Sequence, residues 1–154
     1  MSEIDLWRIG KYKSLSGEGG LRYSARWHTA GRPIVYLAES PAGAMVEVLV
    51  HLELNENSWP SHYDLMRVAV PSGIKIETIR VTDDDGWKLD PSIGRRLGDK
   101  WLASARTALA RVPSAILPKT WNVLLNPEHP AAGKIRIVET IRAEYDPRLL
   151  TKLR

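Results

Sequence analysis

The sequence predicts an α+β fold in a single domain, residues 1–154. Short apolar segments of β-strand character recur along the chain between turns that contain Gly, Pro or Asp, while only two segments have a helical pattern. We find no internal repeat, low-complexity block or long linker that would divide the chain. Because 154 residues suffice to bury a hydrophobic core, one domain is the simplest organisation.

The N-terminal half is expected to place strands and turns before the first helix. We predict a strand at 4–9, a Gly- and Ser-rich loop at 14–20, an extended segment at 21–27, a turn at 29–33 and a strand at 34–38. Ser40-Pro41 then predicts a helix start, because serine caps helices well and proline suits the first helical position. This helix is expected to run to about Leu52 and, since it is apolar nearly all round, to be buried on most sides.

The C-terminal half is expected to combine strands with the second main helix. We predict strands at 66–70 and 74–79 around a turn at 71–73, a polar turn at 83–86, a helix at 91–109, strands at 112–117 and 123–125, and a last strand at 135–145. Gly94 and Gly98 are weak points in the helical pattern. In the last strand apolar residues alternate with mostly polar ones, so we expect it to be half-buried, with Ile137 and Ile141 on its apolar face.

The composition is that of an ordinary soluble protein. The chain is 44% hydrophobic and 26% charged, lacks an apolar run that could span a bilayer and begins without the features of a signal peptide, so we expect a cytoplasmic protein. The lack of cysteine excludes disulfides, thiolate catalysis and zinc–cysteine sites. The four histidines share no metal-ligand spacing, so no metal site is expected. The net charge of +4 suits an anionic ligand or acidic partner, but equally a merely soluble surface.

One carboxylate, that of Glu47, lies inside the apolar run from Ala44 to Val50. An ionised carboxylate is costly in apolar surroundings unless a partner or a ligand compensates for it. On the expected helix His51 is the i+4 neighbour of Glu47, where it can hydrogen-bond the carboxylate and tune its charge. Two interpretations stay open: a structural ion pair with a buried Arg or His, and a carboxylate that faces a ligand cleft.

Several ordered motifs together resemble one known family. They are Gly19-Gly20 before Arg26-Trp27, Tyr36 before Ser40-Pro41, Glu47 before His51, Arg111-Val-Pro-Ser114, and Asn122-Val-Leu-Leu-Asn126-Pro127. In this combination the chain resembles the RES domain, a family of bacterial toxins paired with Xre-type antitoxins. The resemblance extends from Trp7 to Leu149, nearly the whole chain. The chain departs from the usual family pattern at Ala25, where Gly is common, and at His28, where Asn is common.

The resemblance implies a fold similar to that of the ADP-ribosyltransferases, a split β-core that holds NAD+ in a cleft as substrate, with no separate cofactor. It also implies cleavage of the nicotinamide–ribose bond, whose transition state is oxocarbenium-like, as in glycoside cleavage. The nicotinamide ring of NAD+ is a cationic pyridinium and becomes neutral when it leaves, so no second acid is required to protonate it. One carboxylate near the developing cation is then the main electrostatic need, and Glu47 would meet it.

The resemblance also assigns roles to the other motif residues. Arg26, helped by Arg8, would hold the pyrophosphate, since the guanidinium fork binds phosphate oxygens bidentately. Tyr36 would position the nicotinamide, while Ser114 and Asn126 would complete the pocket beside Glu47 and His51. Ordinary structural roles stay open for each: an arginine stem packed beside Trp27, a core tyrosine, a turn-stabilising serine hydroxyl and an Asx turn.

The expected function is that of a toxin that depletes NAD+ and stops growth, neutralised by an Xre-type antitoxin that binds DNA. Water, phosphate or a protein side chain would serve as acceptor, giving a glycohydrolase, a phosphorylase or an ADP-ribosyltransferase. A basic module that binds or cuts RNA is an alternative from another class, motivated by the net charge, and a catalytically inactive interaction protein is a third. We expect no direct nucleic-acid or membrane contact, and a homodimer is left open.

Overall fold

The structure is a computed structural model that describes residues 3–51, 60–82 and 86–151. In this part of the chain, strands form one seven-stranded sheet in the order β4-β5-β6-β2-β1-β3-β7. The strands are β1 (Ile4–Ile9), β2 (Val35–Ala38), β3 (His62–Val70), β4 (Ile76–Thr78), β5 (Leu109–Pro113), β6 (Trp121–Leu125) and β7 (Arg136–Glu144). The helices are α1 (Glu18–Arg22), α2 (Pro41–His51), α3 (Pro91–Ser104) and α4 (Pro147–Thr151), with a 3-10 turn at Ala132–Lys134.

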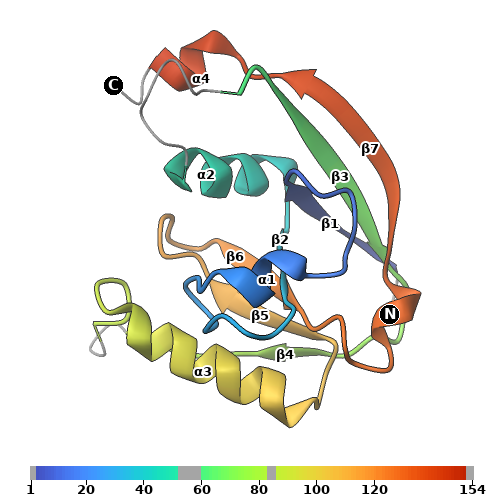
Figure 1. The fold of residues 1–154 in the computed structure, drawn as a ribbon, viewed down its shortest axis with the longest axis vertical. Coiled ribbons are helices and arrows are strands. Elements are labelled where there is room, and N and C mark those ends of the chain that lie inside the picture. The colour runs from blue at the N-terminus through green and yellow to red at the C-terminus, as the bar shows by residue number, and fades with distance from the viewer. Residues whose placement is uncertain (1–2, 52–59, 83–85, 152–154) are drawn as a thin grey trace.

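The sheet is split between β1 and β2. These two strands pair at one position, Trp7 opposite Ala38, whereas β1 pairs with β3 along its whole length. One half of the sheet, the lower half in Figure 1, is therefore β4-β5-β6-β2. The other, the upper half, is β1-β3-β7. Figure 1 shows the long β3 and β7 curving along one side of the molecule, with α2 between them and the lower half. The α+β class and the split β-core expected from the sequence are confirmed.

Two hydrophobic clusters fill opposite faces of the lower half-sheet. Neighbouring residues of a strand face opposite sides, so Leu124 and Leu125 of β6 belong to different clusters. One cluster continues into the upper half through Leu6 and Val68. The other packs α3 against the sheet through Trp101 and joins three tryptophans, Trp27, Trp87 and Trp101. α3 therefore anchors the segment around Trp27, which proves to be part of the site.

Several predicted element boundaries are wrong in the C-terminal half. The helix predicted over 91–109 ends at Ser104, because Ala105 takes a left-handed conformation with φ of 51°. The strand predicted at 112–117 instead runs over Leu109–Pro113, and the residues that follow form a turn around Ser114. β3 begins at His62 instead of 66, and α4 was not predicted. Of the polar turn at 83–86, only Gly86 lies within the described residues.

The N-terminal half shows two further differences. A short helix, α1, occupies residues predicted as loop and extended segment, and Gly20 in it is buried against the main chain of Arg32 and Ile34. α2 starts as predicted, with the Ser40 hydroxyl accepting the N–H of Gly43 at 2.9 Å, while Leu52 lies outside the described residues. The expectation that α2 is buried on most sides is wrong: Ala44 is its buried residue, because the helix lies at the split of the sheet.

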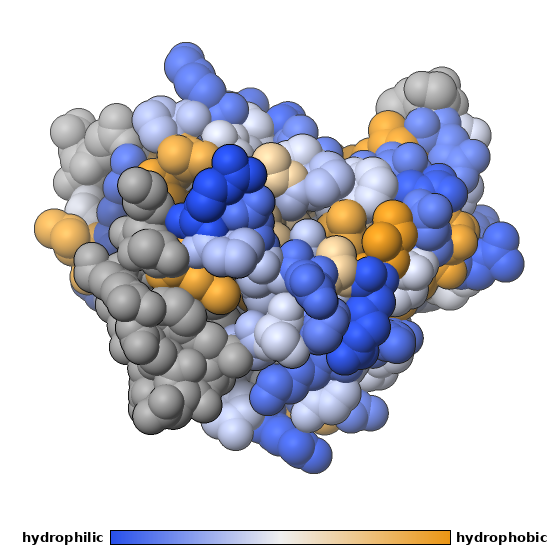
Figure 2. Space-filling view, turned by 90° about the horizontal axis from the view of Figure 1, so that it is seen from above, coloured by the Kyte–Doolittle hydropathy of each residue, from blue (hydrophilic) through white to orange (hydrophobic). Residues whose placement is uncertain are grey.

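The last strand, β7, is more exposed than the alternating pattern predicted. It forms an edge of the sheet in the described part of the chain, and Ile141, expected on an apolar face, is 44% exposed. Val138 is exposed as well, and Figure 2 shows hydrophobic side chains lying among hydrophilic ones on the surface. Within the described ranges, we find no helix long and apolar enough to cross a membrane.

Candidate active site

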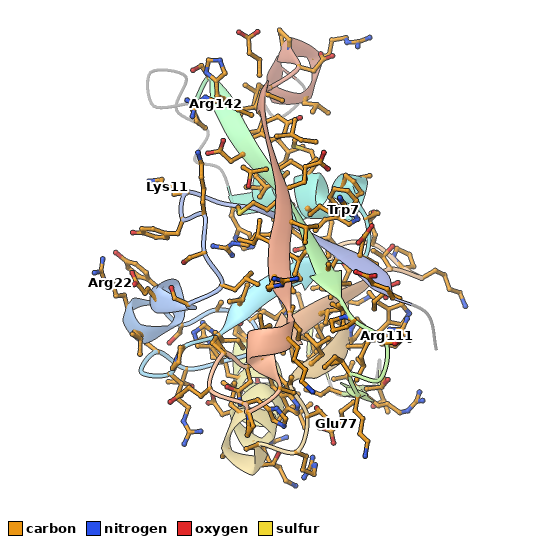
Figure 3. The ribbon with its side chains drawn as sticks, turned by 90° about the vertical axis from the view of Figure 1, so that its right-hand side faces the viewer. Trp7, Lys11, Arg22, Glu77, Arg111 and Arg142 are labelled. Atoms are coloured by element: carbon orange, nitrogen blue, oxygen red, sulfur yellow. The ribbon has the colours of Figure 1, made fainter. Side chains whose placement is uncertain are left out.

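The main cleft lies where the sheet is split. It has a volume of about 660 Å³, within the range of about 300–1000 Å³ usual for small-molecule sites. Its walls come from both half-sheets and from the helices beside them, and Figure 3 shows Trp7 of β1 next to α2. The polar residues of the lining are Arg8, Ser24, Arg26, Tyr36, Glu47, His51, Arg95 and Asn122. Five of the seven predicted site residues therefore line the cleft: Arg8, Arg26, Tyr36, Glu47 and the exposed His51.

The Glu47 carboxylate is held by two neutral hydrogen-bond donors. Its Oε1 accepts from the Ser114 hydroxyl at 3.1 Å and from the Asn122 amide nitrogen at 2.8 Å. The side chain is half-buried, not deeply buried as the apolar run suggested, and its hydrogen bonds do not go to the exposed His51. Among the described residues no cation lies within ion-pair distance of it, and no group of three potential metal ligands forms. The structure therefore favours the interpretation of a carboxylate that faces a cleft.

Ser114 acts through Glu47 and does not line the cleft. Its hydroxyl donates to Glu47 and accepts the N–H groups of Ile116 and Leu117 at 3.1 and 3.2 Å. This one buried hydroxyl thus both stabilises the turn after β5 and orients the carboxylate. The turn role that the sequence left open for Ser114 therefore has structural support, whereas the predicted direct place in the pocket does not: Ser114 reaches the cleft only through Glu47.

Asn126 is not brought to the cleft, whereas Asn122 is. The Asn126 side-chain oxygen accepts the N–H of Glu128 at 3.0 Å, which makes the Asx turn that the sequence left open. Asn122 has no role assigned from sequence, yet it lines the cleft and donates to Glu47. The signal for it was available: an amide side chain in the middle of an apolar strand segment, whose burial requires a polar partner. Its Oδ1 is buried without a partner in the structure.

Three arginines, Arg8, Arg26 and Arg95, line the cleft and give it positive charge. Arg26 donates from Nη1 to the carbonyl oxygens of Trp87 and Lys88 at 3.2 and 3.3 Å, with its guanidinium 5.8 Å from the Trp87 ring. Arg95 of α3 donates from Nε to the Ala25 carbonyl at 2.8 Å. Arg8 keeps a buried Nε without a hydrogen-bond partner, and burial lowers the pKa of its guanidinium. Such a set of fixed, incompletely paired guanidiniums suits an anionic ligand.

Tyr36 is fixed from behind by His28. The Tyr36 oxygen accepts the N–H of Trp27 at 3.2 Å and lies 2.7 Å from His28 Nδ1, while His28 Nε2 lies 3.2 Å from the Gly20 carbonyl. Since a carbonyl can only accept, Nε2 carries the proton, and the Tyr36 hydroxyl donates to Nδ1. Burial raises the pKa of Tyr36, so this hydroxyl stays protonated. His28, in place of the usual Asn, therefore orients Tyr36 and does not itself line the main cleft.

The buried His28 predicts a loss of stability in acid. Burial lowers the pKa of the folded-state imidazole from 6.5, so the unfolded chain binds this proton first as the pH falls. His28 therefore adds no pH dependence to the free energy of unfolding above about pH 6.5. Below that pH the free energy of unfolding decreases, by at most about 1.4 kcal/mol per pH unit for one proton. Urea unfolding at pH 7.5 and pH 5 measures the effect. His28→Asn should reduce the difference in the free energy of unfolding between the two pH values. If that difference stayed the same, this role of His28 would be contradicted.

Comparison with known proteins decides the family. A model of the RES domain matches residues 5–146, which is most of the chain. The chain belongs to the RES domain family. A curated relative of this RES protein, "Toxin Res" of Pseudomonas putida, is 47% identical over 132 residues, covering 86% of this chain and 90% of the relative. The resemblance inferred from the motifs is confirmed.

One further relative and one solved structure extend the comparison of this RES domain. The "Prs ADP-ribosylating toxin" of a Sphingobium strain is 35% identical over 157 residues and covers 95% of this chain and 96% of its own length. The crystal structure of the MbcT–MbcA toxin–antitoxin complex of M. tuberculosis contains a chain that matches with a TM-score of 0.70. That match covers 99% of this chain and 89% of the other at 20% identity, so it shows a shared fold.

Proposed function

We propose that this RES toxin binds NAD+ in the main cleft and breaks the nicotinamide–ribose bond. The observation that carries the proposal is the Glu47 carboxylate, which is oriented by Ser114 and Asn122 but has no cation beside it in the described part of the chain. Two neutral donors fix the position of the negative charge without neutralising it. A fixed, uncompensated charge stabilises a cation that develops during the reaction.

The remaining residues of the cleft suit the other parts of NAD+. The guanidiniums of Arg26 and Arg8 bind the pyrophosphate, and the ring of Tyr36 packs against the nicotinamide. When the bond between nicotinamide and the ribose C1′ breaks, its electron pair stays on the pyridine nitrogen, which becomes neutral. The positive charge moves to the ribose, where Glu47 stabilises it until the acceptor attacks C1′.

The acceptor divides the proposal into variants with one bond cleavage in common. Water or phosphate as acceptor depletes NAD+, whereas a protein side chain becomes ADP-ribosylated. The second variant has a specific observation in its favour, the relative named "Prs ADP-ribosylating toxin". The same name supports NAD+ chemistry over the RNA-cutting alternative.

Purified protein mixed with NAD+ tests the proposal. Free nicotinamide should appear in proportion to enzyme, and mass analysis of the ribosyl product should distinguish ADP-ribose, a phosphorylated ADP-ribose and a modified protein. The last of these requires a protein acceptor in the assay, which a bacterial lysate supplies. NAD+ that stays intact in buffer alone, with added phosphate and with added lysate would refute the proposed bond cleavage.

Alanine variants of Asn122 and Asn126, which lie in the same motif, distinguish a role in the site from a structural role. Asn122→Ala removes one of the two donors that orient Glu47, and a hydrogen bond to a charged group is worth about 1.5–3 kcal/mol. We therefore expect kcat for NAD+ cleavage to fall by about tenfold or more. Asn126→Ala removes an Asx turn instead, so it should lower the free energy of unfolding by about 1 kcal/mol and leave kcat unchanged. Equal kcat values for the two variants would contradict the assignment.

An antitoxin partner is part of the proposal. The structural match belongs to a toxin–antitoxin complex, and the motifs of this chain resemble toxins paired with Xre-type antitoxins. An Xre-type protein that binds the folded toxin would stabilise it by mass action as well as inhibit it. Co-expression with such an antitoxin should relieve growth arrest and raise the Tm of the toxin.

A further inference from the structure

A second cavity adjoins the main cleft. It has a volume of about 190 Å³, below the range of about 300–1000 Å³ usual for a complete small-molecule site. It shares four lining residues with the main cleft, namely Arg8, Ser24, Ala25 and Tyr36. The second cavity is therefore an extension of the main cleft that accommodates one part of a larger ligand.

Arg8 lies at the junction of the two cavities. This residue lines both cavities, and its Nε is buried without a hydrogen-bond partner. Space for the guanidinium depends on Gly10, since a Cβ at that position would lie 3.0 Å from Arg8 Nη2. A buried guanidinium N–H without an acceptor is costly, and an anionic ligand at the junction would satisfy it.

Two exposed tyrosines flank the second cavity. Tyr12 lies in the segment after β1 and is 51% exposed, and Tyr23 follows α1 and is 73% exposed. Exposed aromatic rings beside a cavity suit a flat heteroaromatic ring, because bases stack on them without needing a specific hydrogen-bond pattern. Ser14 and Ser16, whose hydroxyls are 3.0 Å apart, also line this cavity and offer partners for ribose hydroxyls.

We propose that the second cavity binds the adenosine half of the dinucleotide. Arg8 at the junction then contacts the pyrophosphate, and the adenine packs against Tyr12 and Tyr23. The nicotinamide half extends in the opposite direction, toward Glu47 in the main cleft. The identity of the ligand rests on the proposed function, but binding of the adenosine half requires no bond cleavage.

Calorimetric titration of the full chain with ADP-ribose tests this subsite. The double variant Tyr12→Ala/Tyr23→Ala should raise the Kd for ADP-ribose by about tenfold or more, as loss of base stacking on an aromatic ring does. Val138→Ala, which removes an exposed apolar side chain from β7, should bind as the unmodified protein does. Because both tyrosines are exposed, the double variant should keep its fold, and its Tm checks this.

Nicotinamide mononucleotide is the matched ligand because it lacks the adenosine half. Its Kd should be the same for the unmodified protein and the double variant. Lack of ADP-ribose binding, or an equal Kd for ADP-ribose in both proteins, would overturn the subsite. Tyrosine-dependent binding of ADP-ribose without release of nicotinamide from NAD+ would instead support the subsite and refute the proposed cleavage.

Discussion

Glu47→Gln is expected to lower kcat for NAD+ cleavage by about 100- to 1000-fold. Loss of one fixed electrostatic group aimed at the transition state has an effect of this size. Glutamine keeps the shape of the side chain and can still accept from Ser114 and Asn122 through its carbonyl oxygen, so the fold should survive. Because the substitution removes an interaction with the transition state and also an attraction to the positively charged pyridinium of the bound substrate, kcat should fall and kcat/KM should fall further.

Glu39→Gln is the matched control for this experiment. Glu39 precedes α2 and its exposed carboxylate pairs with Arg111 at 3.1 Å, outside the main cleft. An exposed ion pair contributes about 0–1 kcal/mol, so this variant should cleave NAD+ at the normal rate. A fully active Glu47→Gln protein would show that the carboxylate is structural and would remove the main support for the mechanism.

Gly98→Ala is expected to destabilise the protein by at least about 2 kcal/mol. A Cβ at position 98 would overlap the carbonyl oxygen of Trp27, and one at Gly94 would lie 2.6 Å from that of Arg26. α3 therefore packs directly on the main chain that carries Arg26 and His28. Alanine favours a helix over glycine by about 1 kcal/mol, but the overlap with a main-chain atom forces the helix and that segment apart.

Urea unfolding measures the effect, with Gly19→Ala as the control. Gly19 is also helical, but no atom lies within 4 Å of where its Cβ would be. The control should therefore change the free energy of unfolding by no more than about 1 kcal/mol, in the stabilising direction. If Gly98→Ala were as stable as the unmodified protein, the close packing of α3 on residues 26–27 would be refuted.

Local sequence features predicted the elements whose signals lie within a few residues. Ser40-Pro41 marked the start of α2, and the apolar segment at 4–9 matched β1. The end of α3 could not be predicted, because Ala105 has no intrinsic preference for a left-handed conformation and takes it only in this context. α1 was missed because its two glycines are poor helix formers, and tertiary packing of Gly20 overrides that preference.

The candidate site was predictable only as far as single residues carry a signal. Glu47 was evident as one acid in an apolar run, but its partners, Ser114 and Asn122, lie 67 and 75 residues away. The fold alone brings them together. The same reason explains Asn126, which sits in a motif beside Asn122 yet lies outside the cleft because β6 ends between them.

The neutral surroundings of Glu47 have a consequence for turnover. Before bond breaking, the proposed substrate carries a positive pyridinium, which the carboxylate attracts by a few kcal/mol at an effective dielectric constant of about 20. Free nicotinamide carries no charge, so this attraction ends with the reaction itself. In the proposed mechanism, the acid that assists departure of the ring therefore does not retain it, so nicotinamide can diffuse away before the acceptor attacks the ribosyl group.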